Sequence, residues 1–166
     1  MSRASLKFQI FVDKTERLGK CTILPLIGRE DFDIVRIGSG DLPPLTGDFL
    51  LHPDGAPLVR VAGAAGDVRV AAIDCNWSRL APILRRVPGT LPPLARIPDG
   101  FVTAYPRRNK QDRDPPKGLA TIEALFLAAA FRGIWDETLF DQYYFKAAFL
   151  AQNTATFAAF GLGPAN

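Results

Sequence analysis

The sequence has few of the residues that build disulfide frameworks, zinc sites or membrane spans. Two cysteines and one histidine among 166 residues argue against a disulfide scaffold and against a structural zinc site. The longest apolar run, near residues 119–131, is interrupted by Glu123, and the N-terminal residues lack the long apolar core of a signal peptide. We therefore expect a cytoplasmic protein without a membrane partner, in which Cys21 and Cys75 are free thiols.

The sequence does contain enough apolar residues for a folded core. Hydrophobic residues make up 48% of the chain, which suffices for one compact unit or for two small subdomains that share an interface. The formal net charge of +3 permits nucleic acid as a partner, but it is far below that of proteins whose binding depends on charge alone. Composition therefore excludes a disordered chain and leaves the function open.

The first hundred residues carry the pattern of a parallel sheet. Strands are predicted where β-branched and apolar residues cluster or alternate, at residues 8–12, 32–37, 49–51, 68–73 and 100–104. The strand at 68–73 is almost wholly apolar, which is typical of a strand buried on both faces. It ends at Asp74, and α/β proteins bind ligands at the carboxyl edge of such a sheet.

Helical patterns follow this strand and dominate the last third of the chain. Helices are predicted at residues 77–87, at 119–131 with a stop at Gly133, from about Glu137 with Asp136 as N-cap, and at 147–160. The polar stretch 107–117 can only be a loop. The predicted fold class is therefore α/β, with a parallel-sheet domain at 1–104 and an all-helical domain at 105–166.

Residues 72–80, AIDCNWSRL, resemble the V-I-D-C-S-W-A-R-L block of the archaeal and eukaryotic small-subunit rRNA aminocarboxypropyltransferases. These ribosome-biogenesis enzymes complete a hypermodified pseudouridine. Five more blocks are similar to the family in the same order, namely KCT at 20–22, LLHPDG at 50–55, FVTAYP at 101–106, LATIEA at 119–124 and FLAQN at 149–153. The chain departs from the family mainly on the acceptor side, where Tyr105 replaces Asn and the 107–117 loop is longer.

The resemblance implies a fold related to the SPOUT methyltransferases, with a deep trefoil knot in the parallel-sheet domain. It also implies S-adenosylmethionine as donor substrate, with its methyl group buried and its aminocarboxypropyl arm facing the acceptor. Only the sulfonium carbon held in line with the nucleophile reacts. The implied activity is transfer of the 3-amino-3-carboxypropyl group to a uridine or pseudouridine base of RNA. We expect a monomer that acts on small-subunit rRNA.

The resemblance also implies roles for individual residues. Asp74 is the catalytic candidate that takes the proton from the attacking ring nitrogen, and Trp77 is the apolar wall against the donor methyl. The other residues expected at the donor are Thr22, Leu51, Pro53, Phe101, Leu119, Ala120, Thr121 and Glu123. Basic residues expected to contact RNA phosphates are Arg85, Arg86, Arg107, Arg108, Lys110, Arg113 and Lys117. No metal ion is expected.

Several of these roles have a purely structural alternative. Asp74 could cap the helix that follows it, Trp77 could belong to the core, and Glu123 could be a hydrogen-bonded residue at a helix start. Cys75 is expected to be a small buried residue without a nucleophilic role, because no neighbour would lower its pKa.

Two other classes of function also remain open. One is a SAM-dependent enzyme of the same fold that methylates RNA or alkylates a small molecule. The other is a non-catalytic RNA-binding assembly factor.

Overall fold

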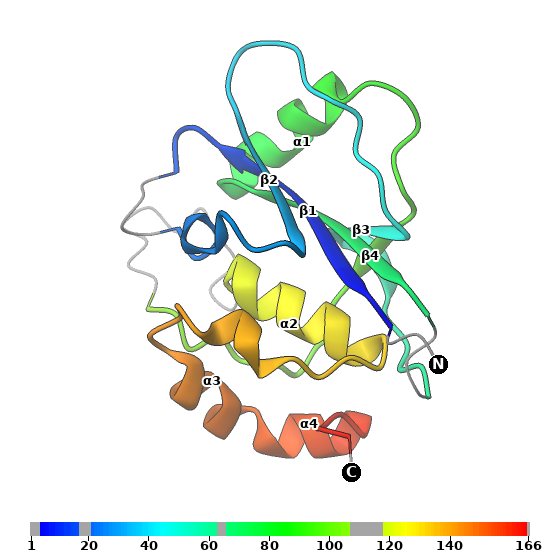
Figure 1. Cartoon of the computed structure of the whole chain (residues 1–166), viewed down its shortest axis with the longest axis vertical. Coiled ribbons are helices and arrows are strands. Elements are labelled where there is room, and N and C mark those ends of the chain that lie inside the picture. Colours follow the sequence, from blue (N-terminus) through cyan, green and yellow to red (C-terminus); the bar gives the residue numbers. More distant parts are fainter. Residues whose placement is uncertain (1–3, 17–20, 63–65, 107–117, 166) are drawn as a thin grey trace.

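Parallel strands form a sheet at the centre of the molecule, in the order β2-β1-β4-β3-β5 (Figure 1). The computed structural model describes residues 4–16, 21–62, 66–106 and 118–165. The strands are β1 (Leu6–Asp13), β2 (Phe32–Ile37), β3 (Phe49–Pro57), β4 (Val68–Asp74) and β5 (Leu94–Arg96). Because all neighbours are parallel, their carboxyl ends lie along one edge of the sheet.

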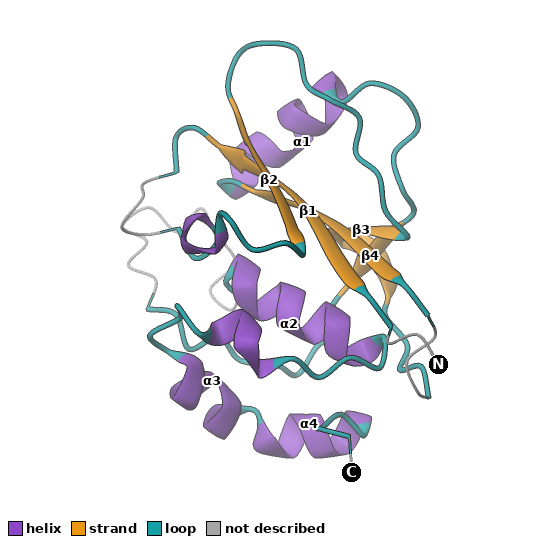
Figure 2. Ribbon diagram, in the orientation of Figure 1, coloured by secondary structure: helices purple, strands orange, loops and turns teal. Residues whose placement is uncertain are grey.

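Helices cover both faces of this sheet (Figure 2). The α-helices are α1 (Trp77–Arg86), α2 (Thr121–Phe131), α3 (Lys146–Gln152) and α4 (Thr154–Phe160), and the short 3₁₀ helices are η1 (Leu24–Leu26) and η2 (Glu137–Phe140). Helix α1 lies on one face, and α2 to α4 lie on the other. Within the described residues, no helix is both long and apolar enough to cross a membrane.

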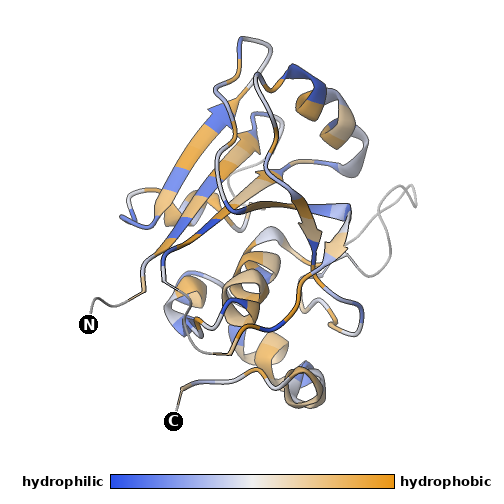
Figure 3. Ribbon diagram, turned by 90° about the vertical axis from the view of Figure 1, so that its right-hand side faces the viewer, coloured by the Kyte–Doolittle hydropathy of each residue, from blue (hydrophilic) through white to orange (hydrophobic). Residues whose placement is uncertain are grey.

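The sheet buries apolar side chains on both of its faces, which explains why its strands appear in the sequence as runs of apolar residues. Alternate residues of β1, such as Phe8 and Ile10, enter a large cluster that they share with Phe126 of α2. Phe11 points the other way, into a smaller cluster that includes Ile83 of α1. In Figure 3 hydrophobic residues predominate in the strands, whereas the helix at the top, α1, also carries strongly hydrophilic residues.

Helix α2 lies between the sheet and the C-terminal helices, so almost all of its residues are buried. A helix that is apolar all round is expected in such a place. Aromatic rings from the later helices surround Phe126, with Phe140, Phe149 and Phe157 among them. The sheet and the C-terminal helices thus share one apolar cluster. A division of the chain at residue 104 stays a prediction.

The structure confirms the first four predicted strands and the helices at α1 and α2. The prediction of the fifth strand is wrong: residues 100–104 form no strand, and β5 is instead Leu94–Arg96 in the proline-rich stretch before them. Among the strands of the described residues, β5 pairs with β3 alone, and its three residues carry too short a pattern to be recognised.

The two remaining helix predictions need correction. The single helix at 147–160 is broken at Asn153, which ends α3 and begins α4. The helix from Glu137 is a short 3₁₀ helix, although Asp136 caps it as expected by accepting a hydrogen bond from the Thr138 amide at 3.0 Å.

Gly55 is required for the pairing of β3 with β5. A Cβ atom at this position would lie 2.4 Å from the backbone nitrogen of Ala95, close to the register shift in this pair of strands. We expect Gly55→Ala to lower the free energy of unfolding by about 1–3 kcal/mol, since rigid backbone must move to relieve the clash. Gly40→Ala is the matched control, because a Cβ there meets nothing within 4 Å. Equal denaturation midpoints for the two variants would contradict this.

Candidate active site

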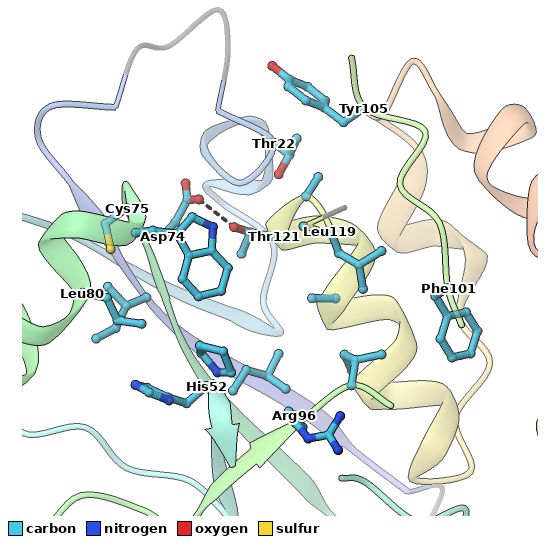
Figure 4. A pocket seen from close by; sticks show the side chains of 18 of the residues that line it. Thr22, His52, Asp74, Cys75, Leu80, Arg96, Phe101, Tyr105, Leu119 and Thr121 are labelled. Atoms are coloured by element: carbon cyan, nitrogen blue, oxygen red, sulfur yellow. Dashed lines mark hydrogen bonds between the residues drawn. The ribbon is translucent and has the colours of Figure 1, made fainter. Parts of the chain in front are cut away.

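A pocket of about 1330 Å³ opens where β4 ends and α1 begins (Figure 4). Its walls come from six parts of the chain, namely Glu16 and residues from the stretches 21–22, 51–53, 73–80, 96–106 and 118–124. The sheet contributes the carboxyl end of β4, and α2 contributes its first turn. The pocket therefore lies at the sheet edge that the sequence pattern indicates.

Asp74 is held in this pocket by two hydrogen bonds to its carboxylate. The Thr121 hydroxyl donates to Oδ1 at 2.6 Å (Figure 4). The Cys21 thiol donates to Oδ2 at 2.9 Å. An ionised carboxylate has about four acceptor sites, so both oxygens retain capacity for a further donor. The helix-cap alternative is wrong, because Asn76 is the N-cap residue of α1 and no side chain bonds to the cap.

The segment at Cys21 and Thr22 is joined to the start of α2. Besides the two bonds to Asp74, the amide of Ile122 donates to the Thr22 hydroxyl oxygen at 3.2 Å. The Cys21 sulfur also accepts from the amide of Ile23 at 3.4 Å. These bonds fix one side of the pocket, where sheet, loop and helix meet.

Trp77 and the other expected donor residues line the pocket, apart from Glu123. Trp77 is half-buried in the first turn of α1 and belongs to neither buried apolar cluster. The core alternative for Trp77 is therefore wrong. Apolar residues that share the pocket with it are Leu51, Pro53, Phe101 and Leu119.

Glu123 lies beneath the pocket and is fully buried. Its Oε1 accepts from the Thr103 hydroxyl at 2.6 Å and from the Ala120 amide at 2.8 Å. Its Oε2 accepts from the Ala104 amide at 2.9 Å and from the Tyr143 hydroxyl at 3.0 Å. The structure therefore shows the hydrogen-bonding alternative for Glu123 and does not bring its carboxylate into the pocket.

Asn153 holds the same wall from the other side. Its side-chain oxygen accepts from the Val102 amide at 2.7 Å, and its side-chain nitrogen donates to the Val102 carbonyl at 2.9 Å. The segment at 101–104 has no strand partner, so these side chains replace the backbone ladder of a sheet. Sequence reasoning assigned no role to Asn153, although it lies in the FLAQN block.

Asp13 and Arg79 form an ion pair beside the pocket. Burial alone would raise the pKa of Asp13, but hydrogen bonds from Arg79 and Thr15, together with the Arg79 charge, lower the pKa overall. The lowered pKa means that the ionised Asp13 carboxylate stabilises the folded state. This contribution to the free energy of unfolding is fully present above the usual aspartate pKa and is lost as the pH falls through the lowered pKa of Asp13. The pair joins the end of β1 to the first turns of α1.

Both cysteines are free, as predicted, and both line the pocket. Burial raises the pKa of the Cys21 thiol to about 12, and the charge and hydrogen bond of Asp74 act in the same direction. Burial also raises the pKa of Cys75 to about 12, with the charges of Asp13 and Asp74 adding to the effect. Neither thiol is activated as a nucleophile.

Of the basic residues expected at RNA, only two lie within the described residues. Arg85 and Arg86 are exposed in the last turn of α1, and Arg86 donates to the carbonyls of Gly38 and Gly40. The residues Arg107, Arg108, Lys110, Arg113 and Lys117 lie outside the described residues.

Two pocket features were missed by sequence reasoning. Cys21 bonds to Asp74, and Arg96 lines the opposite end of the pocket near His52 (Figure 4). Among the residues that the structure describes, no group of three or more His, Cys, Asp or Glu side chains is arranged to hold a metal ion.

Replacement of Glu123 tests its importance for the pocket wall. Glu123→Ala leaves four donors without their acceptor, and each buried unpaired polar group costs about 1–3 kcal/mol. We expect the free energy of unfolding to fall by about 3 kcal/mol or more, measured by urea denaturation. Glu30→Ala is the control, since this exposed side chain should change the stability by less than about 0.5 kcal/mol. Equal effects of the two substitutions would contradict the assignment.

The raised thiol pKa values predict slow alkylation of both cysteines. A pKa of about 12 instead of 9.0 leaves roughly a thousandfold less thiolate at pH 8. Iodoacetamide labelling of the native protein, followed by mass spectrometry, should therefore be far slower than labelling of the unfolded chain. Its rate should rise about tenfold per pH unit while the protein stays folded. Rapid labelling of either cysteine at pH 7 would contradict the assigned environment.

The fold is similar to that of the SAM-dependent rRNA:acp-transferase Tsr3 from Vulcanisaeta distributa. The two chains share 22% sequence identity with a TM-score of 0.66, and the match covers 93% of this chain and 82% of that one. No protein-family model and no curated protein sequence matches the chain. The similarity agrees with the family resemblance of the sequence blocks, and this chain therefore has the fold of that transferase.

Proposed function

We propose that this protein transfers the 3-amino-3-carboxypropyl group of S-adenosylmethionine to a uridine or pseudouridine base of RNA, with small-subunit rRNA as the expected acceptor. The observation that carries the proposal is the position of Asp74, a fixed carboxylate in a large pocket with several apolar side chains. The fold similarity to an rRNA:acp-transferase supports the same reaction.

The residues present fit S-adenosylmethionine as the donor. The apolar side chains of Leu51, Phe101 and Leu119 suit a neutral adenosine, and Trp77 offers a rigid surface to the methyl group. The Asp74 carboxylate suits a site that receives a sulfonium cation. Pockets for one small ligand occupy about 300–1,000 Å³, so this pocket has room for part of a second reactant as well.

Asp74 acts as the base in the proposed reaction. It takes the proton from the ring nitrogen while that nitrogen forms its new bond to carbon. The donor supplies the sulfonium carbon as electrophile, and methylthioadenosine leaves with the electron pair of the broken carbon–sulfur bond. Thr121 and Cys21 keep the carboxylate in place, and Trp77 shields the methyl carbon from attack. Glu123 contributes through the wall it holds rather than by contact with the donor.

The proposal includes features of the whole molecule that the sequence resemblance implies. These are a trefoil knot in the sheet, a separate helical domain at 105–166, a monomeric state and a cytoplasmic location. Arg85 and the exposed part of Arg86 would contact RNA phosphates from the last turn of α1. A related enzyme with another acceptor is the second candidate, favoured by Tyr105 at the pocket in place of the family's Asn.

The reaction product tests the proposal. Incubation with S-adenosylmethionine and small-subunit rRNA should release methylthioadenosine and add the aminocarboxypropyl group to the RNA, both detected by mass spectrometry. Asp74→Asn should lower the transfer rate by about 10²- to 10⁴-fold, because the amide cannot accept the proton. Its donor affinity, measured by calorimetry, should change far less.

Asp33→Asn is the matched control, since Asp33 is exposed on β2 and does not line the pocket. Release of adenosylhomocysteine would identify a methyltransferase instead. Full activity of Asp74→Asn would contradict the role of Asp74 as base. Failure to bind S-adenosylmethionine would contradict the proposal as a whole.

A further inference from the structure

Three aromatic side chains form a row that starts at the pocket and ends on the outer surface. Tyr105 lines the pocket and meets Phe145 edge to face, with ring centroids 5.9 Å apart. Phe145 in turn meets Tyr144 edge to face at 5.0 Å. We call Tyr105, Phe145 and Tyr144 the aromatic row. In Figure 4, Tyr105 lies at the margin of the pocket and its hydroxyl points away from the residues at the centre.

The members of the row differ in exposure. Tyr105 and Phe145 are partly buried and pack against the large apolar cluster. Tyr144 is 91% exposed, the highest value among the exposed large hydrophobic side chains of the described residues. An edge-to-face contact covers at most one face of a ring, so Tyr144 keeps an open aromatic face. The row therefore presents a ring to solvent on a support that the core holds in place.

The Glu123 carboxylate, which holds the pocket wall, also holds the segments that carry the aromatic row. Tyr105 follows directly on the segment that Glu123 holds through Thr103 and Ala104. Tyr143, which precedes Tyr144, donates to the same carboxylate and also packs against Phe145. The residues that directly precede Tyr105 and Tyr144 in the chain are thus bound to the carboxylate that holds the pocket wall.

We propose that the exposed end of the aromatic row, Tyr144 with Phe145 behind it, stacks on an unpaired base that neighbours the target base of the RNA acceptor. This inference rests on the proposed function and specifies its substrate as locally single-stranded. A base inside a duplex cannot reach a pocket of this kind, so the acceptor must be splayed or unpaired there. Aromatic faces bind such bases by stacking, and the net charge of +3 is compatible with a polyanion.

A salt series of RNA affinities tests this inference on the full-length protein. The probe is a labelled single-stranded oligouridylate, and binding is measured by fluorescence anisotropy. Tyr144→Leu keeps an apolar side chain but removes the aromatic face, so the affinity should fall about 5- to 150-fold. The dependence of affinity on salt should keep its slope, because no phosphate contact is removed.

Two control variants sharpen the test. Tyr144→Phe keeps the ring and should bind like the parent. Val59→Ala alters another exposed apolar residue, which does not line the pocket, and should also bind like the parent. Equal affinity of Tyr144→Leu and the parent overturns the inference but leaves the proposed function standing. An equal loss for Tyr144→Phe and Tyr144→Leu also overturns it, because the hydroxyl would then be responsible.

The parent protein separates this inference from the proposed function. If the parent shows no RNA affinity at low salt, both the RNA acceptor and the stacking role are overturned. If Tyr144→Leu leaves RNA binding unchanged but abolishes self-association in sedimentation, the row is a contact between two copies of the chain, and the stacking role is overturned.

Discussion

A buried carboxylate needs hydrogen-bond donors on all sides, and the pocket of this protein depends on how Glu123 meets that need. Its donors come from the wall at 103–104, from the start of α2 and from Tyr143 before α3. The three segments are separated in the chain, and the Glu123 carboxylate accepts a hydrogen bond from each of them. Because apolar contacts are not directional, the hydrogen bonds to this carboxylate contribute the directional part of their mutual positions.

The same constraint separates the roles of the two acidic residues of the site. Glu123 has both oxygens occupied by four donors and faces no ligand space. Asp74 has two donors, lies in the pocket and retains acceptor capacity. One carboxylate therefore builds the wall while the other is available for chemistry. Residues at the edge of that wall, Tyr105 above all, connect the pocket with the outer surface.

The sequence predicts those parts of the fold in which a local pattern is long enough. Strands β1 and β4 and helix α2 bury most of their residues, and their apolar runs show it. Strand β5 is too short to carry such a pattern, and the break at Asn153 arises from a tertiary bond to Val102. The expected donor residues were predicted through the family resemblance, whereas Cys21 and Arg96 of the pocket were missed. The hydrogen bond between Cys21 and Asp74 joins residues 53 positions apart, so no local sequence pattern predicts it.

The position of β4 in the sheet has a consequence for the order of folding. It lies between β1 and β3, so the centre of the sheet cannot close until the chain has been made as far as Asp74. The bond from Thr121 to Asp74 spans 47 residues, and that from Ile122 to Thr22 spans 100. Contacts between residues so far apart in the chain form slowly, because closing the loop between them costs conformational entropy before the contact itself contributes any stabilisation. During synthesis on the ribosome, the pocket at Asp74 is therefore completed only after α2 has emerged.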